Sequence, residues 1–397
     1  MKLEIYSKDW CPYCAKAKAL LRSEGIGYEE LDVTHDKDRE QEMVDRSGRR
    51  TVPQIFLDGQ PLGGYDDLAK LHGQGLLKSM LGLKDRSAEV DVYDVVIVGA
   101  GPAGLSAGLY TARKNLTTLV LAYDLGGQMG TTYEIANYPG VGQTNGPDLV
   151  DGFLAQAQGA GVEVRLGQMV ESVTSSQGVK EIRTQAGETI RARAVIVATG
   201  AFKRKLGIPG EKQLQGRGVV YCSTCDGPLF HGKSVAVVGG GNSGLEAAIE
   251  MSGIAREVFL ISEHAWTGDG LLQDKLSTLS NLTQLPFHRP LEIHGRDQVN
   301  GLTLLDVRTE REKRLELDAV FVEIGLTPNS GFLTQVLALN ERGEVPVERS
   351  GATTLDGIFA AGDVTTDDKQ IVVAAGSGAR AGLAAFSYLV KHPLARS

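Results

Sequence analysis

Two glycine-rich stretches constrain the fold of this 397-residue chain more than any other feature. Residues 94–104 read DVVIVGAGPAG and residues 234–244 read SVAVVGGGNSG, so each is a buried-strand run that leads directly into Gly-x-Gly-x-x-Gly. In this pattern a strand enters a tight turn and then a helix whose N-terminus binds a pyrophosphate. Two copies predict two Rossmann-like α/β domains, each of which binds a dinucleotide.

The three glycines of each motif have different tasks. The first makes the tight turn, the second lets the backbone approach the pyrophosphate, and the third lets the helix pack close to the strand. The predicted contacts are Gly99, Gly101, Pro102, Ala103 and Gly104 in the first loop and Gly239, Gly241, Asn242, Ser243 and Gly244 in the second. For the first motif taken alone, a turn without a ligand is the alternative.

The four cysteines form two Cys-x-x-Cys pairs, Cys11 with Cys14 and Cys222 with Cys225. Such a pair closes as a disulfide and opens as a dithiol, and thereby carries two electrons. A zinc ribbon is the alternative, but its pairs lie about 15–20 residues apart. Here more than two hundred residues separate the pairs, so we expect redox chemistry and no metal site.

The N-terminal pair belongs to a predicted α/β unit at residues 1–82. We expect strands at residues 3–6, 28–33 and 52–59, and helices from residue 14, over residues 37–46 and from residue 63. Cys11 then lies just ahead of a helix N-terminus, where the helix dipole and free N–H groups favour a thiolate and lower its pKa. Cys14 lies one turn into the helix and suits a resolving thiol.

Three segments of this unit resemble glutaredoxins: Cys-Pro-Tyr-Cys at residues 11–14, Thr-Val-Pro at 51–53 and Gly-Gly-Tyr-Asp-Asp-Leu at 63–68. The resemblance implies a thioredoxin-like fold in which Pro53 is cis and faces the disulfide. It also implies a glutathione site formed by Lys8, Tyr13, Thr51, Val52, Pro53 and Asp66. A structural module with an inert cysteine pair is the alternative.

Further loop and strand segments accompany the first glycine motif, at residues 126–128, 137–140, 194–200, 357–363 and 369–371. Together they resemble the flavin domain of the thioredoxin reductase family, which is split in sequence by an inserted nicotinamide domain. The implied FAD contacts, besides the first loop, are Gly127, Gln128, Asn137, Thr199, Gly200, Gly362, Asp363, Lys369, Gln370 and Ile371. A carboxylate such as that of Asp363 can bind a ribityl hydroxyl.

The expected fold class is therefore α/β, with a thioredoxin-like N-terminal domain followed by two Rossmann-like dinucleotide-binding domains. The NAD domain is inserted in the FAD domain. The predicted limits are 1–82 for the glutaredoxin-like domain, 83–92 for a polar linker, 93–205 and 327–397 for the FAD-binding domain, and 206–326 for the NAD(P)-binding domain with its redox pair.

Residues 93–392 resemble more closely the flavoprotein subunits of bacterial alkyl hydroperoxide reductases, through the runs at 225–230, 240–244, 272–276 and 369–371. That family is NADH-linked and carries a tandem thioredoxin-like domain, which a single glutaredoxin-like unit replaces here. Glu263 follows the next strand about 20 residues after the glycines, where an acid binds the ribose 2′-OH of NAD. No arginine lies beside it in sequence, which favours NADH over NADPH; a solvated loop acid is the alternative.

These resemblances imply a path for electrons from NADH through FAD to the Cys222–Cys225 disulfide. Cys225 would be the thiol next to the flavin and Cys222 the interchange thiol that attacks Cys11–Cys14. Asp226 would supply a proton to the leaving thiolate, or alternatively caps the turn before Gly227. One flavin face cannot hold both nicotinamide and disulfide, so we expect the inserted domain to rotate about residues 205–207 and 325–328.

Several functions and partners stay open at this point. The final acceptor is a glutathione mixed disulfide, a protein disulfide or a peroxiredoxin in peroxide defence. The alternatives are a reductase for a separate thioredoxin and a redox-sensing flavoprotein. The net charge of −8 argues against nucleic-acid binding. Residues 95–112 are uncharged but rich in glycine, which suits a strand and helix start better than a membrane span. We expect a cytoplasmic homodimer.

Overall fold

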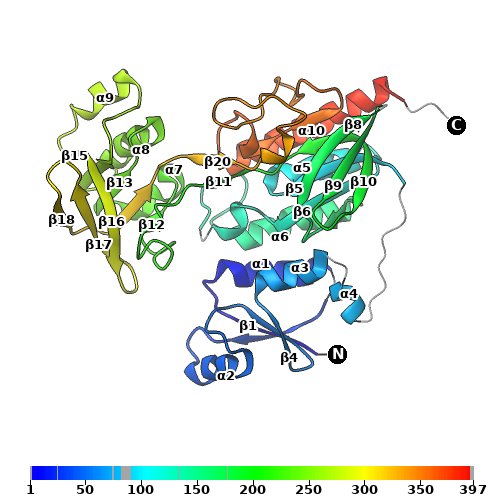
Figure 1. The fold of residues 1–397 in the computed structure, drawn as a ribbon, viewed down its shortest axis with the longest axis horizontal. Coiled ribbons are helices and arrows are strands. Elements are labelled where there is room, and N and C mark those ends of the chain that lie inside the picture. The colour runs from blue at the N-terminus through cyan, green and yellow to red at the C-terminus, as the bar shows by residue number, and fades with distance from the viewer. Residues whose placement is uncertain are drawn as a thin grey trace. The chain divides into compact units, whose positions relative to one another are not determined.

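The computed structural model describes residues 2–24, 26–73, 76–81, 91–132, 134–176 and 178–393. The chain divides into two units (Figure 1): Met1–Ala201 with Pro328–Ser397, and Phe202–Thr327. The first unit therefore contains both ends of the chain, and the second is a continuous insertion. Most of the predicted linker, residues 83–90, lies outside the described residues.

The N-terminal part of the first unit has a four-stranded sheet in the order β2-β1-β3-β4. Its elements are β1 (Leu3–Ser7), α1 (Pro12–Ser23), β2 (Glu29–Asp32), α2 (Lys37–Ser47), β3 (Gln54–Leu57), β4 (Gln60–Gly63), α3 (Tyr65–Gly73) and α4 (Leu76–Met80). β1 pairs with β2 in parallel and with β3 antiparallel. The strand and helix order is thioredoxin-like, as expected, although β4 and α4 were not predicted.

The rest of the first unit is built on a seven-stranded sheet, β7-β6-β5-β10-β9-β8, with β21 also paired to β10. The strands are β5 (Tyr93–Ala100), β6 (Thr118–Leu125), β7 (Glu163–Arg165), β8 (Val170–Ser176), β9 (Val179–Thr184), β10 (Thr189–Val197) and β21 (Ile358–Ala360). The helices are α5 (Pro102–Ala112), η1 (Met129–Thr131), α6 (Gly146–Gly159), η3 (Gly331–Leu333), η4 (Gly362–Val364) and α10 (Ile371–Lys391).

β21 and α10 return to this sheet after the inserted unit. β21 lies parallel to β10, with Val195 opposite Ile358. α10 packs on α5 so closely that a Cβ on Gly378 would lie 2.0 Å from the carbonyl oxygen of Ala103. Segments on either side of the insertion therefore build one core, which is the split arrangement that the sequence predicted.

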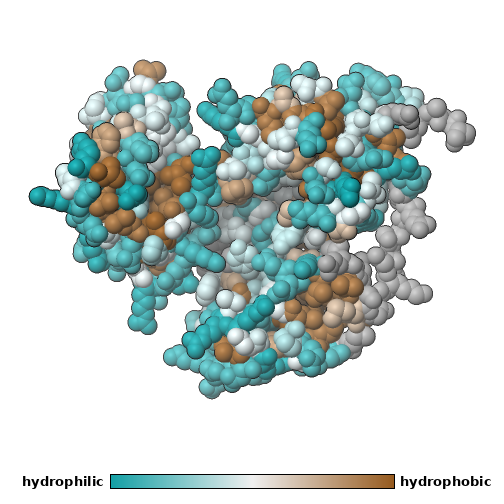
Figure 2. Space-filling model, in the orientation of Figure 1, coloured by the Kyte–Doolittle hydropathy of each residue, from teal (hydrophilic) through white to brown (hydrophobic). Residues whose placement is uncertain are grey.

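α10 also passes a length and composition test for a membrane span, with 21 residues and a mean hydropathy of 1.2 in its best window. Its small residues, including Ala374, Gly378, Ala381 and Ala385, are buried inside the first unit. Buried helices in the core of a protein commonly have the length and composition of a membrane span. In Figure 2 apolar surface lies in separate patches between hydrophilic residues on the visible face.

The second unit has a five-stranded parallel sheet in the order β12-β19-β13-β14-β15. Its elements are β12 (Val219–Val220), α7 (Ser223–Asp226), η2 (Gly227–Phe230), β13 (Ser234–Val238), α8 (Asn242–Ser252), β14 (Glu257–Ser262), α9 (Gly270–Leu276), β15 (Leu282–Pro286) and β19 (Ala319–Val322). An antiparallel layer of β16 (His288–Gly295), β17 (Val299–Asp306) and β18 (Arg311–Leu315) precedes β19.

Two short strands carry the chain into and out of the second unit. β11 (Ala201–Lys203) pairs with β20 (Leu326–Pro328), and the Arg204 N–H donates to the Gly325 carbonyl at 3.1 Å. The two connections thus run side by side, the first just before the predicted hinge residues 205–207 and the second at residues 325–328. The rotation itself stays a prediction.

Candidate active site

The first glycine loop joins β5 to α5 at the carboxyl edge of the large sheet. Gly99 has a φ of +113°, and a Cβ there would lie 2.3 Å from the Ala198 carbonyl oxygen. A Cβ on Gly104 would lie 1.8 Å from the Gly99 carbonyl oxygen, whereas one on Gly101 would meet nothing closer than 4.0 Å. As predicted, Gly99 makes the tight turn, Gly104 allows the helix to pack closely, and Gly101 leaves the approach to the loop open.

The start of α5 suits an anion. No side chain caps this helix at Gly101, and Pro102 and Ala103 occupy its first turn. The N–H groups of a helix's first turn have no partner within the helix and bind phosphates well. This cradle, which side chains at the glycines would fill, fits the pyrophosphate of FAD.

The structure brings several of the other predicted FAD contacts together. The Gln128 side-chain amide donates to Asp363 Oδ2 at 3.1 Å and to the Ala201 carbonyl at 2.8 Å. Asn137 donates to the Gln370 side chain at 3.3 Å, and Ile371 opens α10. Residues from both halves of the split domain thus meet, with the Asp363 carboxylate placed at η4 after Gly362, where it fits a ribityl hydroxyl.

Other predicted FAD residues have protein partners. The Lys369 ammonium binds the Glu344 carboxylate at 3.0 Å, and the Thr199 hydroxyl donates to the Asn329 carbonyl at 2.7 Å. Gly127 and Gly200 both have positive φ, at +55° and +65°. These residues shape the loops of the site, and direct contact with FAD stays a prediction for each.

Asp124 lies near the end of β6. A register shift after Val98 lets Ala100 pair with Leu125, so β6 continues through residue 125. The Asp124 carboxylate forms an ion pair with Lys16. The side chain therefore has a charged partner within the first unit.

The second glycine loop joins β13 to α8 with the same geometry. A Cβ on Gly244 would lie 2.2 Å from the Gly239 carbonyl oxygen, whereas one on Gly241 would meet nothing closer than 3.8 Å. No side chain caps α8. Asn242 exchanges hydrogen bonds with Asp269, at 2.9 and 2.8 Å, and Ser243 follows it in the first helical turn. This loop fits the pyrophosphate of a nicotinamide dinucleotide.

Glu263 follows β14 as predicted, but an arginine lies beside it. Arg289 of β16 approaches the Glu263 carboxylate at 3.4 Å, and both side chains are about half exposed. The expectation that no arginine accompanies Glu263 holds only along the sequence. The antiparallel layer supplies the guanidinium from 26 residues away.

The second cysteine pair forms a disulfide between Cys222 and Cys225, with an S–S distance of 2.12 Å and a Cα–Cα distance of 5.3 Å. Cys222 caps the short helix α7, and its sulfur accepts the N–H of Cys225 at 3.1 Å. The Asp226 N–H donates to the Cys222 carbonyl at 3.0 Å. Asp226 therefore closes the turn, and its acid–base role stays a prediction.

Two acidic residues beside this disulfide were missed in the sequence. Glu250 of α8 accepts hydrogen bonds from Ser223 at 2.6 Å and Thr224 at 3.3 Å. Glu323 follows β19, and burial raises its pKa to about 7 while Lys203 opposes the rise. A glutamate directly after the apolar run at residues 319–322 is the signal that marks this position.

The first cysteine pair is present as two thiols, both buried. Cys11 caps α1, and its sulfur accepts the Cys14 N–H at 3.3 Å. A hydrogen bond from the Cys14 thiol, the N–H groups of Cys14 and Tyr13, and the charge of Lys18 lower the pKa of Cys11 to about 7, against burial. Burial raises the pKa of Cys14 far above its usual range. The predicted division into attacking and resolving thiols agrees with these directions.

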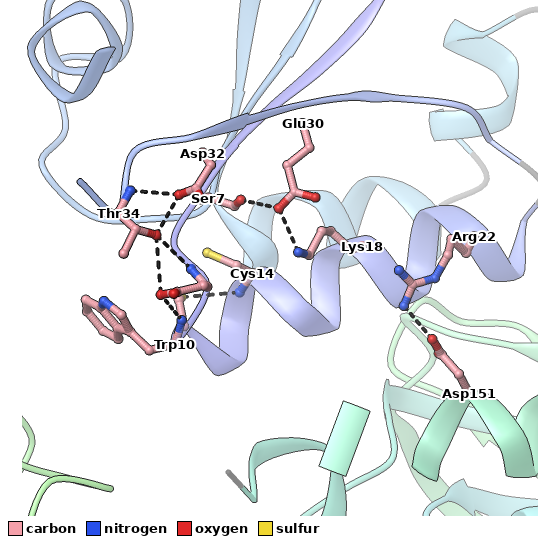
Figure 3. A network of polar contacts seen from close by, with 11 residues as sticks. Ser7, Trp10, Cys14, Lys18, Arg22, Glu30, Asp32, Thr34 and Asp151 are labelled. Carbon is pink, nitrogen blue, oxygen red and sulfur yellow. Dashed lines mark hydrogen bonds and ion pairs between the residues drawn. The ribbon is translucent and has the colours of Figure 1, made fainter. Parts of the chain in front are cut away.

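Figure 3 shows the polar contacts beside this pair. The Lys18 ammonium binds the Glu30 carboxylate at 2.7 Å, and Glu30 also accepts the Ser7 hydroxyl at 2.5 Å. Arg22, further along α1, pairs with Asp151 of α6 at 2.7 Å. Glu30 partly neutralises Lys18, the charge that also favours the Cys11 thiolate.

The predicted glutathione residues differ in exposure and in the partners they already have. The Val52–Pro53 bond is cis, as the resemblance implied, and the Val52 carbonyl oxygen lies 3.5 Å from Cys11 Sγ. Tyr13 is 49% exposed, and Thr51 and Asp66 are also exposed. Lys8, by contrast, holds the Glu40 carboxylate at 2.8 Å. The predicted contact of Lys8 with a glutathione carboxylate would compete with Glu40, and the glutathione site stays a prediction.

Two family models match this chain. The pyridine nucleotide-disulphide oxidoreductase model matches residues 93–379, and the glutaredoxin model matches residues 3–62. The chain belongs to the pyridine nucleotide-disulphide oxidoreductase family. Members of this family use FAD and NAD(P)H, and this chain is such a flavoprotein disulfide oxidoreductase with a glutaredoxin domain. The resemblances and the fold class are thereby confirmed.

Within this family, the chain is similar to proteins with one particular name. The F subunit of alkyl hydroperoxide reductase from Staphylococcus aureus (strain NCTC 8325 / PS 47) is 40% identical over 345 residues, which are 86% of this chain and 67% of that protein. The protein of the same name from Pseudomonas putida is 40% identical over 365 residues, or 88% and 69%.

Two solved thioredoxin reductases have the same fold over about three quarters of this chain. That of Streptococcus pyogenes MGAS5005 is 33% identical with a TM-score of 0.72, and covers 76% of this chain and 99% of its own. That of Giardia duodenalis is 32% identical with a TM-score of 0.72, and covers 76% and 100%. Among the described residues no group of three or more His, Cys, Asp or Glu side chains is placed to hold a metal ion.

Proposed function

We propose that this enzyme passes electrons from NADH through FAD to the Cys222–Cys225 disulfide, then to Cys11–Cys14, and from Cys11 to a peroxiredoxin disulfide. The observation that carries this proposal is the presence in one chain of two Cys-x-x-Cys sites and two dinucleotide loops. The similarity to the F subunits of alkyl hydroperoxide reductases supports both NADH and the peroxiredoxin.

The acidity of Cys11 supports its role as the outward thiol. With a pKa of about 7, a large share of Cys11 is thiolate at neutral pH, and the thiolate is the attacking form. Glutaredoxin pairs lie about 40–70 mV above thioredoxin in potential, so transfer to Cys11–Cys14 from a pair poised like thioredoxin is downhill by about 2–3 kcal/mol.

Anaerobic NADH oxidation by the purified holoenzyme tests the proposal. A 2-Cys peroxiredoxin, glutathione disulfide and thioredoxin are offered in turn, with wild type and Cys11→Ser. We expect the peroxiredoxin to drive rapid oxidation that Cys11→Ser abolishes. Oxidation driven by glutathione disulfide alone would make glutathione adducts the substrate. Slow oxidation with every acceptor would contradict the proposal and favour a redox sensor.

A reductase for a separate thioredoxin is the second candidate. Thioredoxin reductases of known structure align over nearly their whole length with about three quarters of this chain, without the N-terminal domain. In this case Cys222 delivers electrons directly, so thioredoxin reduction would survive Cys11→Ser. The two candidates therefore differ in the response to one substitution.

The proposal includes a homodimer and a reducing compartment such as the cytoplasm, where thiols stay reduced. α10 exposes Val372, Leu383 and Val390, at 43%, 40% and 62%, and such apolar residues on one helix suit an interface between copies. Sedimentation of the holoenzyme should give twice the chain mass.

A further inference from the structure

Glu323 lies where the second glycine loop and the Cys222–Cys225 disulfide come together within the second unit. Its N–H donates to the Val238 carbonyl at 2.8 Å, at the carboxyl end of β13. Its own carbonyl oxygen would lie 2.2 Å from a Cβ on Gly239. Its carboxylate accepts the backbone N–H of Ser223, the residue that follows Cys222.

The charges around Glu323 are unevenly balanced. Glu250 of α8 and Asp226 of α7 repel its carboxylate, and Lys203 of β11 attracts it. The Lys203 ammonium also hydrogen-bonds the Tyr221 carbonyl, and Glu250 binds the hydroxyls of Ser223 and Thr224. Three carboxylates and one ammonium therefore surround the four-residue helix that holds the disulfide.

We propose that Glu323 takes up a proton when the Cys222–Cys225 disulfide is reduced, and that it thereby sets the pH dependence of this pair's reduction potential. The inference rests on the proposed role of this disulfide as the internal redox pair. Reduction leaves negative charge on sulfur one residue from the N–H that Glu323 binds. A new like charge favours the neutral form of a nearby carboxyl.

Reduction of the Cys222–Cys225 disulfide takes up a different number of protons in each of two pH ranges. Where Glu323 is ionised, the disulfide and the carboxylate take up two electrons and two protons, and give one thiolate, one thiol and a neutral carboxyl. Where Glu323 is already neutral, the same reduction takes up one proton. The electrons come from NADH through the flavin, and the protons come from water. The pKa of about 7 that burial gives Glu323 places the change between the two ranges near neutrality.

Glu323 is thus a positioning residue that acts through the Ser223 N–H and through its charge. It does not need to touch either sulfur. The same contact ties the helix that carries the disulfide to the loop that binds the nicotinamide dinucleotide. Loss of the carboxylate should therefore change the reduction potential of Cys222–Cys225, while the disulfide still forms.

The test measures the reduction potential of Cys222–Cys225 between pH 5.5 and 8.5, in full-length holoenzyme that carries Cys11→Ser and Cys14→Ser. Dithiol redox buffers and thiol labelling give the reduced fraction. Each proton taken up makes reduction tenfold less favourable per pH unit, or about 30 mV for a two-electron couple. With Glu323 in place we expect one more proton above pH 7 than below it, and with Glu323→Gln no such change.

Two further variants and one spectroscopic measurement support the test. Glu323→Asp should keep the change of slope, and so should Glu250→Gln, which removes a neighbouring carboxylate on α8. Infrared difference spectra at pH 8 should gain the C=O band of a neutral carboxylic acid on reduction, and Glu323→Gln should lack it. This spectrum of unsubstituted Glu323 decides the question if the glutamine variant does not fold.

Two results would overturn the inference: a change of slope near pH 7 that persists in Glu323→Gln, or a carboxyl band that persists in this variant. Failure of the proposed function has a different signature. In that case NADH fails to reduce Cys222–Cys225 in any variant, while the dithiol buffers still report its potential and its pH dependence.

Discussion

At the residue scale, the two thiols of the N-terminal pair differ in acidity because burial raises the pKa of Cys14 and a contact with Cys14 lowers that of Cys11. The hydrogen bond from the Cys14 thiol contributes most to the lowered pKa of Cys11, ahead of the N–H groups at the start of α1. The sequence predicted the direction from the helix N-terminus alone. A side-chain donor one turn away therefore adds to the effect of the N–H groups at the start of the helix.

Cys14→Ala should therefore raise the pKa of Cys11 above 7, because it removes this donor. A rise of about one unit makes alkylation of Cys11 by iodoacetamide about tenfold slower at pH 6, where the thiolate fraction falls in proportion. Cys14→Ser is the matched control, since its hydroxyl still donates and should preserve most of the rate. Equal rates in both variants would show that the N–H groups alone set the acidity.

At the scale of elements, the contact between α5 and α10 ties the two halves of the split flavin domain to the first glycine loop. A Cβ on Gly378 would lie 2.0 Å from the carbonyl oxygen of Ala103, in the first turn of α5 beside the loop, whereas one on Gly376 would meet nothing within 4 Å. The two glycines belong to the same helix and differ only in what they face.

Gly378→Ala should therefore push α10 away from the loop, destabilise the protein by about 1–3 kcal/mol and weaken FAD binding. Gly376→Ala should leave FAD bound and raise stability by up to about 1 kcal/mol through helix propensity. Thermal unfolding and the flavin retained on gel filtration measure both effects. If the two variants retain flavin equally, close packing at Gly378 does not shape the loop.

The elements that the sequence predicted are those with strong local signals. Both glycine loops combine an apolar run with a fixed glycine spacing, so β5, β13 and the starts of α5 and α8 were predictable. β4 and α4 are short and have weak patterns. The bulge that extends β6 through Asp124, the approach of Arg289 to Glu263, and the cluster around Glu323 depend on contacts between distant segments, which no local pattern encodes.

At the scale of the whole molecule, the question is whether electrons pass within one chain. A tethered acceptor faces its donor at an effective concentration on the order of mM for a short flexible linker. We therefore expect reduction of Cys11–Cys14 by NADH to be independent of protein concentration at micromolar levels and below.

A mixture of Cys11→Ser and Cys222→Ser proteins tests this expectation. Each variant retains the pair that the other lacks, so only transfer between chains can restore peroxiredoxin reduction. We expect little activity at submicromolar concentration and a rise with the square of concentration. If peroxiredoxin reduction returns as soon as the two variants exchange subunits, the two pairs instead meet across a dimer.

The pairing of β11 with β20 has a consequence for how this protein family can diversify. Residues 202–327 begin and end on neighbouring strands. A host fold tolerates an insert whose ends lie close together, so this segment can be exchanged as a unit. Coenzyme preference, which we predict to depend on Glu263, can then be exchanged by recombination at two adjacent crossover points without a change in the flavin site.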